Sequence, residues 1–213
     1  MAGARQTIDS KRRTPKRAGA RDTVETIFEA TARILQTEGL AALNTNRIAE
    51  VAGVSVGALY GYFPNKDAIL MSMARRELDA LRDRVSAALN APEDGVHPAR
   101  RAIRALIKGY NVRNRARRIL METLFSRGGT EEMARPVSEI AHLIAQHGAR
   151  LFPQGAVIPS EVGLFVLTQA VDSVVRTATY GNVSFLASQE FEDELVRLII
   201  GFVMTPPDAV RAL

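Results

Sequence analysis

The sequence predicts an all-α protein, and two observations support this fold class. Apolar residues recur at helical spacing over most of the 213 residues, and no segment shows the alternation of a β-strand between hairpin turns. Glycine or proline marks the joints between the helical segments. At roughly 150 residues per domain, the length allows one small module and one larger body.

The first 21 residues are predicted to form a flexible basic arm. They carry seven Lys or Arg side chains against one acid, which gives the arm a charge of +6 and leaves the rest of the chain at −1. A polyanion partner and a merely solubilising terminus explain this equally well. A helix over 22–38 is expected next, because Asp22 and Glu25 have the spacing of a capping box and Gly39 ends the apolar repeat.

Residues 44–63 predict two short helices joined at a glycine. Asn44 and Ser55 are suited to cap the two helices, and Gly53 supplies the left-handed backbone of a tight turn. The inner faces carry small or apolar residues, namely Ile48, Ala49, Ala52, Val54, Leu59 and Phe63. This pattern describes a helix-turn-helix, which needs the helix at 22–38 to complete a three-helix core.

The same segment resembles the N-terminal domain of the TetR family of bacterial one-component repressors. The residues that match the family pattern, in register, are Ile48-Ala49, Ala52-Gly53-Val54-Ser55, Leu59-Tyr60, Tyr62-Phe63 and Lys66-Asp67. The match covers about 22–70, and beyond it the likeness is one of size and helical layout. The resemblance implies a homodimer that binds a palindromic double-stranded DNA operator and is released by a small amphipathic effector. Activation, or repression with a corepressor, uses the same parts and stays open.

Hydroxyl and ammonium groups in this pattern suit phosphate oxygens. The predicted phosphate contacts are Thr45, Ser55, Tyr60, Tyr62 and Lys66. The outer side of the second helix offers no hydrogen-bonding side chain, so base recognition is expected mainly from Asn46 and Arg47. Val56 or Ala58 can meet thymine methyl groups, and Gly57 allows close backbone approach. The structural alternatives are capping alone for Ser55, partial core packing for the two tyrosines and an ordinary surface charge for Lys66.

The rest of the chain predicts a larger helical body. Helices are expected at about 66–89, 99–112, 114–126, 131–151, 160–180 and 188–204. Asn65 is suited to cap the first of these, and the stretch 161–175 is apolar nearly all round, which predicts burial on most sides. Together with the resemblance, this divides the chain into an arm at 1–21, a DNA-binding domain at 22–66 and a ligand-binding and dimerisation domain at 67–213.

The resemblance implies that the last two helices form the dimer and that the others enclose a ligand pocket, with the helix at 66–89 transmitting the signal. The predicted dimer contacts, which intramolecular packing could also explain, are Leu167, Leu195, Leu198, Ile199 and Phe202. Residues that mix apolar walls with polar groups are the pocket candidates. They are Leu106, Tyr110, Leu124, Phe125, His142, Phe165, Gln169 and Asp172. Pairing with Arg176 one turn later is the structural alternative for Asp172.

Several function classes are excluded or disfavoured. The chain has no cysteine, which excludes disulfides and thiolate metal sites and favours a reducing compartment. No apolar run approaches the roughly 20 residues that span a bilayer, so a cytoplasmic protein is expected. The three histidines lack metal-ligand spacing, and no cofactor is predicted.

Two alternatives remain beside the DNA-binding prediction. The run 53–57 matches the G-x-S-x-G elbow of hydrolases, but that elbow requires a strand before it, so no enzyme is predicted. An all-helical small-molecule-binding protein or enzyme without specific DNA binding is the second hypothesis.

The basic run between Arg100 and Arg118 is either a solvated face paired with acids or a surface that attracts an anion.

Overall fold

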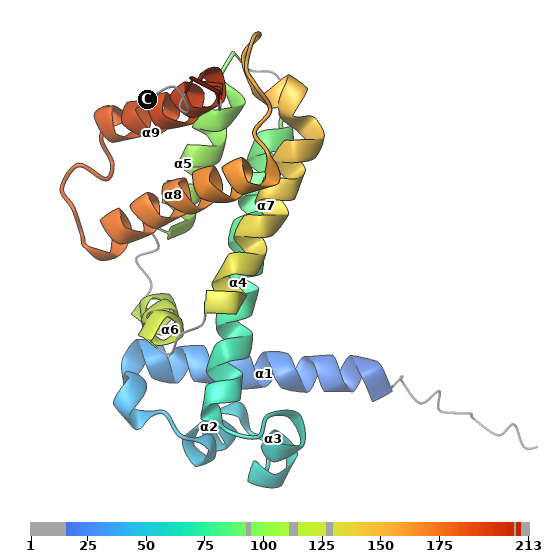
Figure 1. Cartoon of the computed structure of the whole chain (residues 1–213). Helices are drawn as coiled ribbons and strands as arrows, with labels where there is room; N and C mark the ends of the chain where they lie inside the picture. The colour runs from blue at the N-terminus through green and yellow to red at the C-terminus, as the bar shows by residue number, and fades with distance from the viewer. Residues whose placement is uncertain (1–15, 93–94, 111–114, 127–129, 207, 210–213) are drawn as a thin grey trace, which may run out of the picture. The chain divides into compact units, whose positions relative to one another are not determined.

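The computed structural model describes residues 16–92, 95–110, 115–126, 130–206 and 208–209. Over these residues the chain is helical and contains no β-strand, which confirms the predicted fold class (Figure 1). The chain divides into two compact units, Met1–Ile69 and Leu70–Leu213. Each unit has a hydrophobic core of its own.

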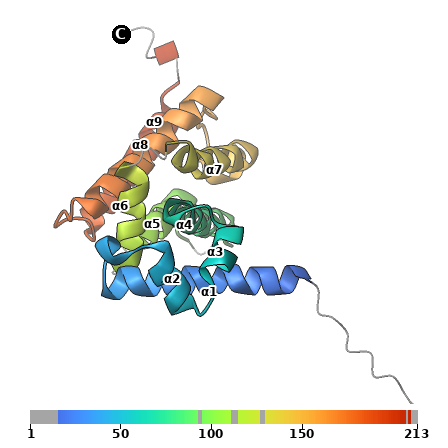
Figure 2. The same cartoon turned by 90° about the horizontal axis from the view of Figure 1, so that it is seen from below.

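The first unit is the predicted three-helix bundle with a short addition. It contains α1 (Lys16–Thr37), a 3-10 turn at Leu40–Ala42, α2 (Thr45–Ala52), α3 (Val56–Tyr62) and the first turn of α4 (Lys66–Asn90). Helix α1 packs against α2, and α3 follows α2 across a tight turn (Figure 2). Side chains exposed by no more than 1% fill the core, namely Ile27, Ile34, Leu35, Leu43, Ile48, Leu59 and Ile69.

The start of the first helix differs from the prediction. Helix α1 begins at Lys16, so Asp22 and Glu25 lie inside the helix and do not form its N-terminal cap. Residues 16–21 are rich in Lys, Arg and Ala, which are good helix formers, and an aspartate in mid-helix costs too little to end it. Of the predicted arm, residues 1–15 lie outside the described residues, and the remainder belongs to α1.

The second unit contains the rest of α4 and five further helices close to their predicted bounds. These are α5 (Pro98–Tyr110), α6 (Arg115–Ser126), α7 (Thr130–Leu151), α8 (Glu161–Tyr180) and α9 (Gln189–Met204). Asn65 caps α4 as predicted, because its Oδ1 accepts a hydrogen bond from the Ala68 N–H at 2.9 Å. Helix α8 packs against α5 and α7, and α9 packs against α5 and α8.

Helix α8 is buried on one side only, so the prediction of burial on most sides is wrong within a single chain. Its inner face, including Leu164, Leu167 and Val175, lies in the core. Outside this face, four large apolar side chains stay exposed, namely Val162, Phe165 and Val166 on the opposite side and Val174 at the edge of the inner face. Apolar periodicity cannot distinguish a face that is buried within one chain from a face that is left for a partner.

Carboxylates partner the basic run in the second unit, as the solvated-face interpretation predicts. Arg100 Nη1 lies 2.7 Å from Glu192 Oε1, and Arg104 Nε lies 2.9 Å from Glu192 Oε2. Arg101 instead donates to three backbone carbonyls near the end of α4, those of Ala88, Ala91 and Val96. Arg100, Arg101 and Arg104 therefore have a structural role, because they connect α5 to α9 and to the end of α4.

Candidate nucleic-acid interface and ligand cavity

The predicted caps and turn of the helix-turn-helix are confirmed. Asn44 Oδ1 accepts from the Arg47 N–H at 2.9 Å, and Ser55 Oγ accepts from the Ala58 N–H at 3.1 Å. Gly53 has φ 67°, the left-handed conformation that the tight turn requires. Because the Ser55 oxygen accepts the capping bond, its O–H group stays available as a donor to a phosphate oxygen.

Three of the five predicted phosphate-binding side chains gather at the start of α2. The Thr45 and Tyr60 hydroxyl oxygens are 3.2 Å apart, and Lys66 Nζ donates to the Leu43 carbonyl at 3.0 Å. Tyr62 is also exposed. It follows Tyr60 by two residues, which rotates it by roughly 200° around α3. Tyr62 therefore lies apart from this group. Ser55 also lies apart from it, at the start of α3.

Asn46 and Arg47, the two polar side chains predicted to read bases, differ in whether ion pairs already occupy them. The Arg47 guanidinium pairs with Glu38 and with Glu50, each at 2.9 Å. The hydrogen bond that Arg47 donates to Glu38, followed by the one that it donates to Glu50, raises the pKa of Arg47 above its usual value. Asn46 is exposed at the second position of α2. Reading a base with Arg47 would require breaking both ion pairs, so Asn46 is the better placed of the two.

The outer side of α3 is free of side-chain obstruction. Val56, Gly57 and Ala58 are all exposed, and a Cβ atom built on Gly57 would meet nothing within 4 Å. The glycine is therefore not required by packing within the described part of the chain. A second macromolecule that approaches this backbone closely would explain it.

We expect Gly57→Ala to make the first unit more stable and to weaken DNA binding. Alanine is favoured over glycine within a helix by roughly 0.5–1 kcal/mol, and no atom lies in its way. The added methyl group would occupy the space that the duplex needs. Chemical unfolding and DNA-binding titrations measure the two effects. The control is Gly61→Ala, which also meets no obstruction and should give the stability gain with a smaller loss of affinity. Unchanged DNA affinity in Gly57→Ala would contradict close backbone approach.

The hydrolase alternative is not supported by the structure. Ser55 lies between two helices and caps the second. No strand precedes it in any described segment, so the sheet that a nucleophile elbow requires is missing there.

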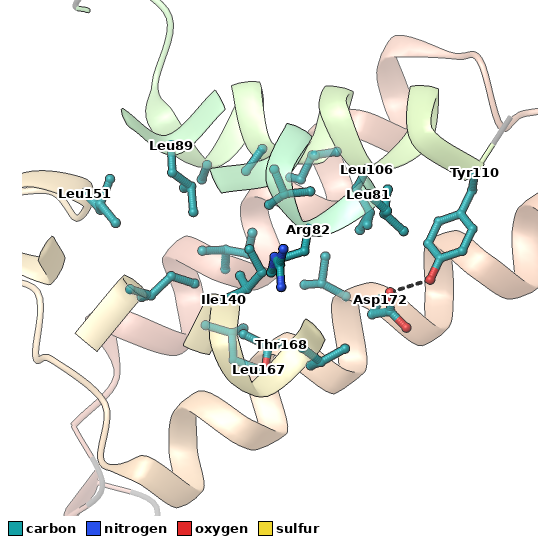
Figure 3. Close-up of a pocket in the computed structure, with 18 of the residues that line it drawn as sticks. Leu81, Arg82, Leu89, Leu106, Tyr110, Ile140, Leu151, Leu167, Thr168 and Asp172 are labelled. Carbon is teal, nitrogen blue, oxygen red and sulfur yellow. Dashed lines mark hydrogen bonds between the residues drawn. The ribbon is translucent and has the colours of Figure 1, made fainter. Parts of the chain in front are cut away.

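A cavity of about 120 Å³ lies within the second unit, between α4, α5, α7, α8 and α9 (Figure 3). Its wall is apolar except for Arg82, Tyr110, Thr168 and Asp172. Apolar cavities with a few convergent polar groups are typical of sites for small organic molecules.

Three of the eight predicted pocket residues line this cavity, namely Leu106, Tyr110 and Asp172. Leu124 belongs to a separate core cluster with Ala74, Leu78 and Met121. Phe165 and His142 are exposed, and Gln169 is half-buried outside the cavity wall. These four therefore do not line this cavity. The Phe125 side chain lies outside the described residues.

Asp172 is held between two neighbours at one end of the cavity. Tyr110 donates its hydroxyl to Asp172 Oδ1 at 2.8 Å, and Arg176 Nε lies 3.6 Å from Oδ2. The predicted pairing with Arg176 is thus present, together with a tyrosine that the sequence did not reveal as its partner. Burial raises the pKa of Asp172, and burial and then the Asp172 charge raise the pKa of Tyr110. Burial also raises the pKa of Tyr180, whose ring stacks edge-on against Tyr110, to about 12.

The predicted dimer contacts divide into buried and accessible residues. Leu167 and Leu195 are 4% and 3% exposed and belong to core clusters, which favours the intramolecular alternative for both. Ile199 is part of the cavity wall, and Phe202 packs against the core of α8. Leu198 is exposed on α9.

Comparison with known proteins agrees with this architecture. The family model described as bacterial regulatory proteins, tetR family, matches residues 27–73, which span the helix-turn-helix. The N-terminal part of the chain is therefore a TetR-family DNA-binding domain. Among the solved structures similar to it is a TetR-family transcriptional regulator from Streptomyces coelicolor, with a TM-score of 0.61 and 20% identity. The match covers 87% of this chain and 99% of that one. That likeness shows a TetR-family fold over nearly the whole length.

Curated relatives match the N-terminal part of the chain. The transcriptional regulator BetI 1 of Chromohalobacter salexigens is 36% identical over 97 residues, which are 46% of this chain and 46% of that protein. The transcriptional repressor KstR of Mycolicibacterium smegmatis is 39% identical over 75 residues, 34% of this chain and 37% of that protein. The chain thus spans less than half the length of these curated relatives.

In the described segments, no helix is long and apolar enough to cross a membrane. The same segments contain no group of three or more His, Asp or Glu side chains arranged to hold a metal ion.

Proposed function

We propose that this TetR-family protein is a homodimeric transcriptional repressor that leaves a palindromic operator when a small amphipathic molecule enters the cavity. The observation that carries the proposal is the gathering of Thr45, Tyr60 and Lys66 at the start of α2, beside an α3 with an open outer side. We assign it no catalytic activity and place its work in the cytoplasm, where bacterial DNA is found.

Phosphate contacts would fix the position of the protein on the duplex. The two hydroxyls and the ammonium group at the start of α2 lie within one short stretch of surface, which suits neighbouring phosphate oxygens of one strand. Ser55 would add a contact from the start of α3. Tyr62 would reach a phosphate at a different point along the backbone.

Base recognition would come from α2 and α3 together. The Asn46 amide suits adenine, and the exposed methyl groups of Val56 and Ala58 suit thymine. Arg47 is proposed to hold α2 in place through Glu38 and Glu50 rather than to read a base directly.

The exposed apolar face of α8 supports a dimer. Val162, Phe165 and Val166 lie within about 100° of one another around α8 and would be buried against the same face of a second copy, with Leu198 of α9 as a further contact. A two-fold interface of this kind makes the operator palindromic, because each half-site then faces one copy.

Linkage would couple the cavity to DNA binding. A molecule that binds one dimer shape more tightly shifts the population toward that shape. Helix α4 contributes five residues to the cavity wall, Leu78, Leu81, Arg82, Val85 and Leu89, and its first turn belongs to the DNA-binding unit. Occupation of the cavity can therefore act on the helix that continues from the DNA-binding unit.

The test is a binding titration with the DNA upstream of the coding region and with a shuffled duplex of equal length and composition. We expect the upstream DNA to bind about a thousandfold more tightly or better. Two neighbouring substitutions separate the roles of the groups at the start of α2. Thr45→Val should weaken binding to both duplexes equally, whereas Asn46→Ala should weaken binding to the upstream DNA alone. Equal binding of both duplexes by the unaltered protein would overturn the proposal in favour of a helical small-molecule-binding protein.

A further inference from the structure

The cavity wall contains two side chains that carry charge, and these define what the cavity can accept. Among the described lining residues they are Arg82 of α4 and Asp172 of α8. Figure 3 shows Arg82 at the middle of the wall and Asp172 beside Tyr110 at one end. The two differ in how far neighbouring groups already satisfy them.

Carboxylates surround Arg82 and occupy its donors. Its Nε and Nη2 donate to Asp83 Oδ1 at 3.0 and 2.8 Å, and Nη1 donates to Asp79 Oδ1 at 3.4 Å and to Glu139. These hydrogen bonds to Asp83 and Glu139 raise the pKa of Arg82. An anionic ligand would have to displace one of these three carboxylates and would be repelled by the others. Arg82 is therefore a poor receptor for an acidic head group.

Asp172 is less completely satisfied. Its Oδ1 accepts one hydrogen bond from Tyr110 at 2.8 Å, while the closest approach of Arg176 Nε to Oδ2 is 3.6 Å, longer than a normal hydrogen bond. A carboxylate can accept several hydrogen bonds, and this one is largely removed from water. A donor group placed in the cavity would replace a hydrogen bond that the Asp172 carboxylate loses when burial removes it from water.

The remaining wall is suited to a hydrocarbon body. Leucine, isoleucine and valine side chains from five helices form most of it, including Leu81, Leu106, Ile140, Leu167 and Ile199. Apolar area removed from water would supply most of the binding free energy, and the polar end would set the orientation.

We propose that the cavity takes a cationic amphiphile, an apolar body with one protonated amino group that donates to Asp172. Asp172 attracts the ammonium group, and the carboxylates around Arg82 repel an acidic head group. That such a molecule controls DNA binding rests on the proposed function, whereas its binding in the cavity does not.

The experiment compares three probes with the same chain and different head groups. Octylamine, octan-1-ol and octanoate are titrated into the full-length protein, and dissociation constants are measured by calorimetry at neutral pH and low concentration. We expect octylamine to bind about tenfold more tightly than octan-1-ol, because both head groups can donate to Asp172 but only the ammonium group adds the attraction of opposite charges. Octanoate should bind more weakly than the alcohol.

Variants identify the receptor group. Asp172→Asn keeps the shape and the oxygen that accepts from Tyr110, and should remove the preference for octylamine over octan-1-ol. The matched control is Glu194→Gln, which removes one negative charge from an exposed ion pair with Arg197 on α9 and should leave the preference intact. If Asp172→Asn fails to fold, Tyr110→Phe provides the second variant. It leaves the carboxylate in place, so the amine preference must persist, and its loss would contradict the proposal.

The outcomes separate this inference from the proposed function. Equal or tighter binding of octan-1-ol or octanoate by the unaltered protein would overturn the cationic ligand and leave DNA regulation unaffected. A clear amine preference with unchanged operator affinity would support the inference and contradict the proposed effector mechanism. Amine preference that survives Asp172→Asn would place the head group elsewhere and overturn the assignment to Asp172.

Discussion

Leu59→Ala is expected to abolish specific DNA binding while the second unit stays folded. Leu59 is 0% exposed and is the one buried side chain of α3. Removing a core leucine side chain costs about 2.7–5.0 kcal/mol, and a domain as small as the first unit is expected to have little stability beyond about 5 kcal/mol. Helix α3 has seven residues and is too short to persist without its core contact.

Two observables check this result. Differential scanning calorimetry should show a weakened or lost transition for the first unit and an unchanged one for the second, and operator binding should fall below detection. The matched control is Leu40→Ala in the 3-10 turn, where the side chain is 36% exposed. It should cost less than about 1 kcal/mol and preserve binding. Operator affinity that survives Leu59→Ala would mean that α3 does not carry the interface.

The helix-turn-helix could be predicted from the sequence because local chemistry determines it. Asn44, Gly53 and Ser55 each act on backbone groups within a few residues, so their identity and spacing are sufficient. The start of α1 could not be predicted in this way, because a capping box inside a run of helix formers gives the same signal as one at a helix end.

The cavity was only partly predictable, because its wall comes from residues far apart in the sequence. Leu124 has the hydrophobicity of a pocket residue, yet α6 directs it into a different core cluster. Arg82 was missed, although an arginine beside the apolar stripe of α4, next to Leu81 and Val85, was a usable signal. The Tyr110–Asp172 hydrogen bond joins residues 62 positions apart, and no spacing rule reaches that distance.

The apolar outer face of α8 gives the second large expected effect. Phe165→Glu should convert the dimer into a monomer, because Phe165 is 51% exposed in the single chain and would meet its own copy across a two-fold axis. A charge on each side of that axis would be buried without a partner and would face its equal. Affinity for the full palindrome should then fall on the order of a hundredfold or more, since two linked half-sites no longer reinforce each other.

Sedimentation velocity and titrations with full and half operators measure both parts of this prediction. The half-operator affinity should stay the same, because the first unit is unaltered. The matched control is Phe185→Glu, the same substitution at a phenylalanine that is 53% exposed between α8 and α9, outside the proposed interface. It should remain dimeric and bind the full operator normally. If Phe165→Glu stayed dimeric, or if Phe185→Glu became monomeric, the dimer interface would not lie on this face of α8. The exposed valines of α8 would then require a different partner.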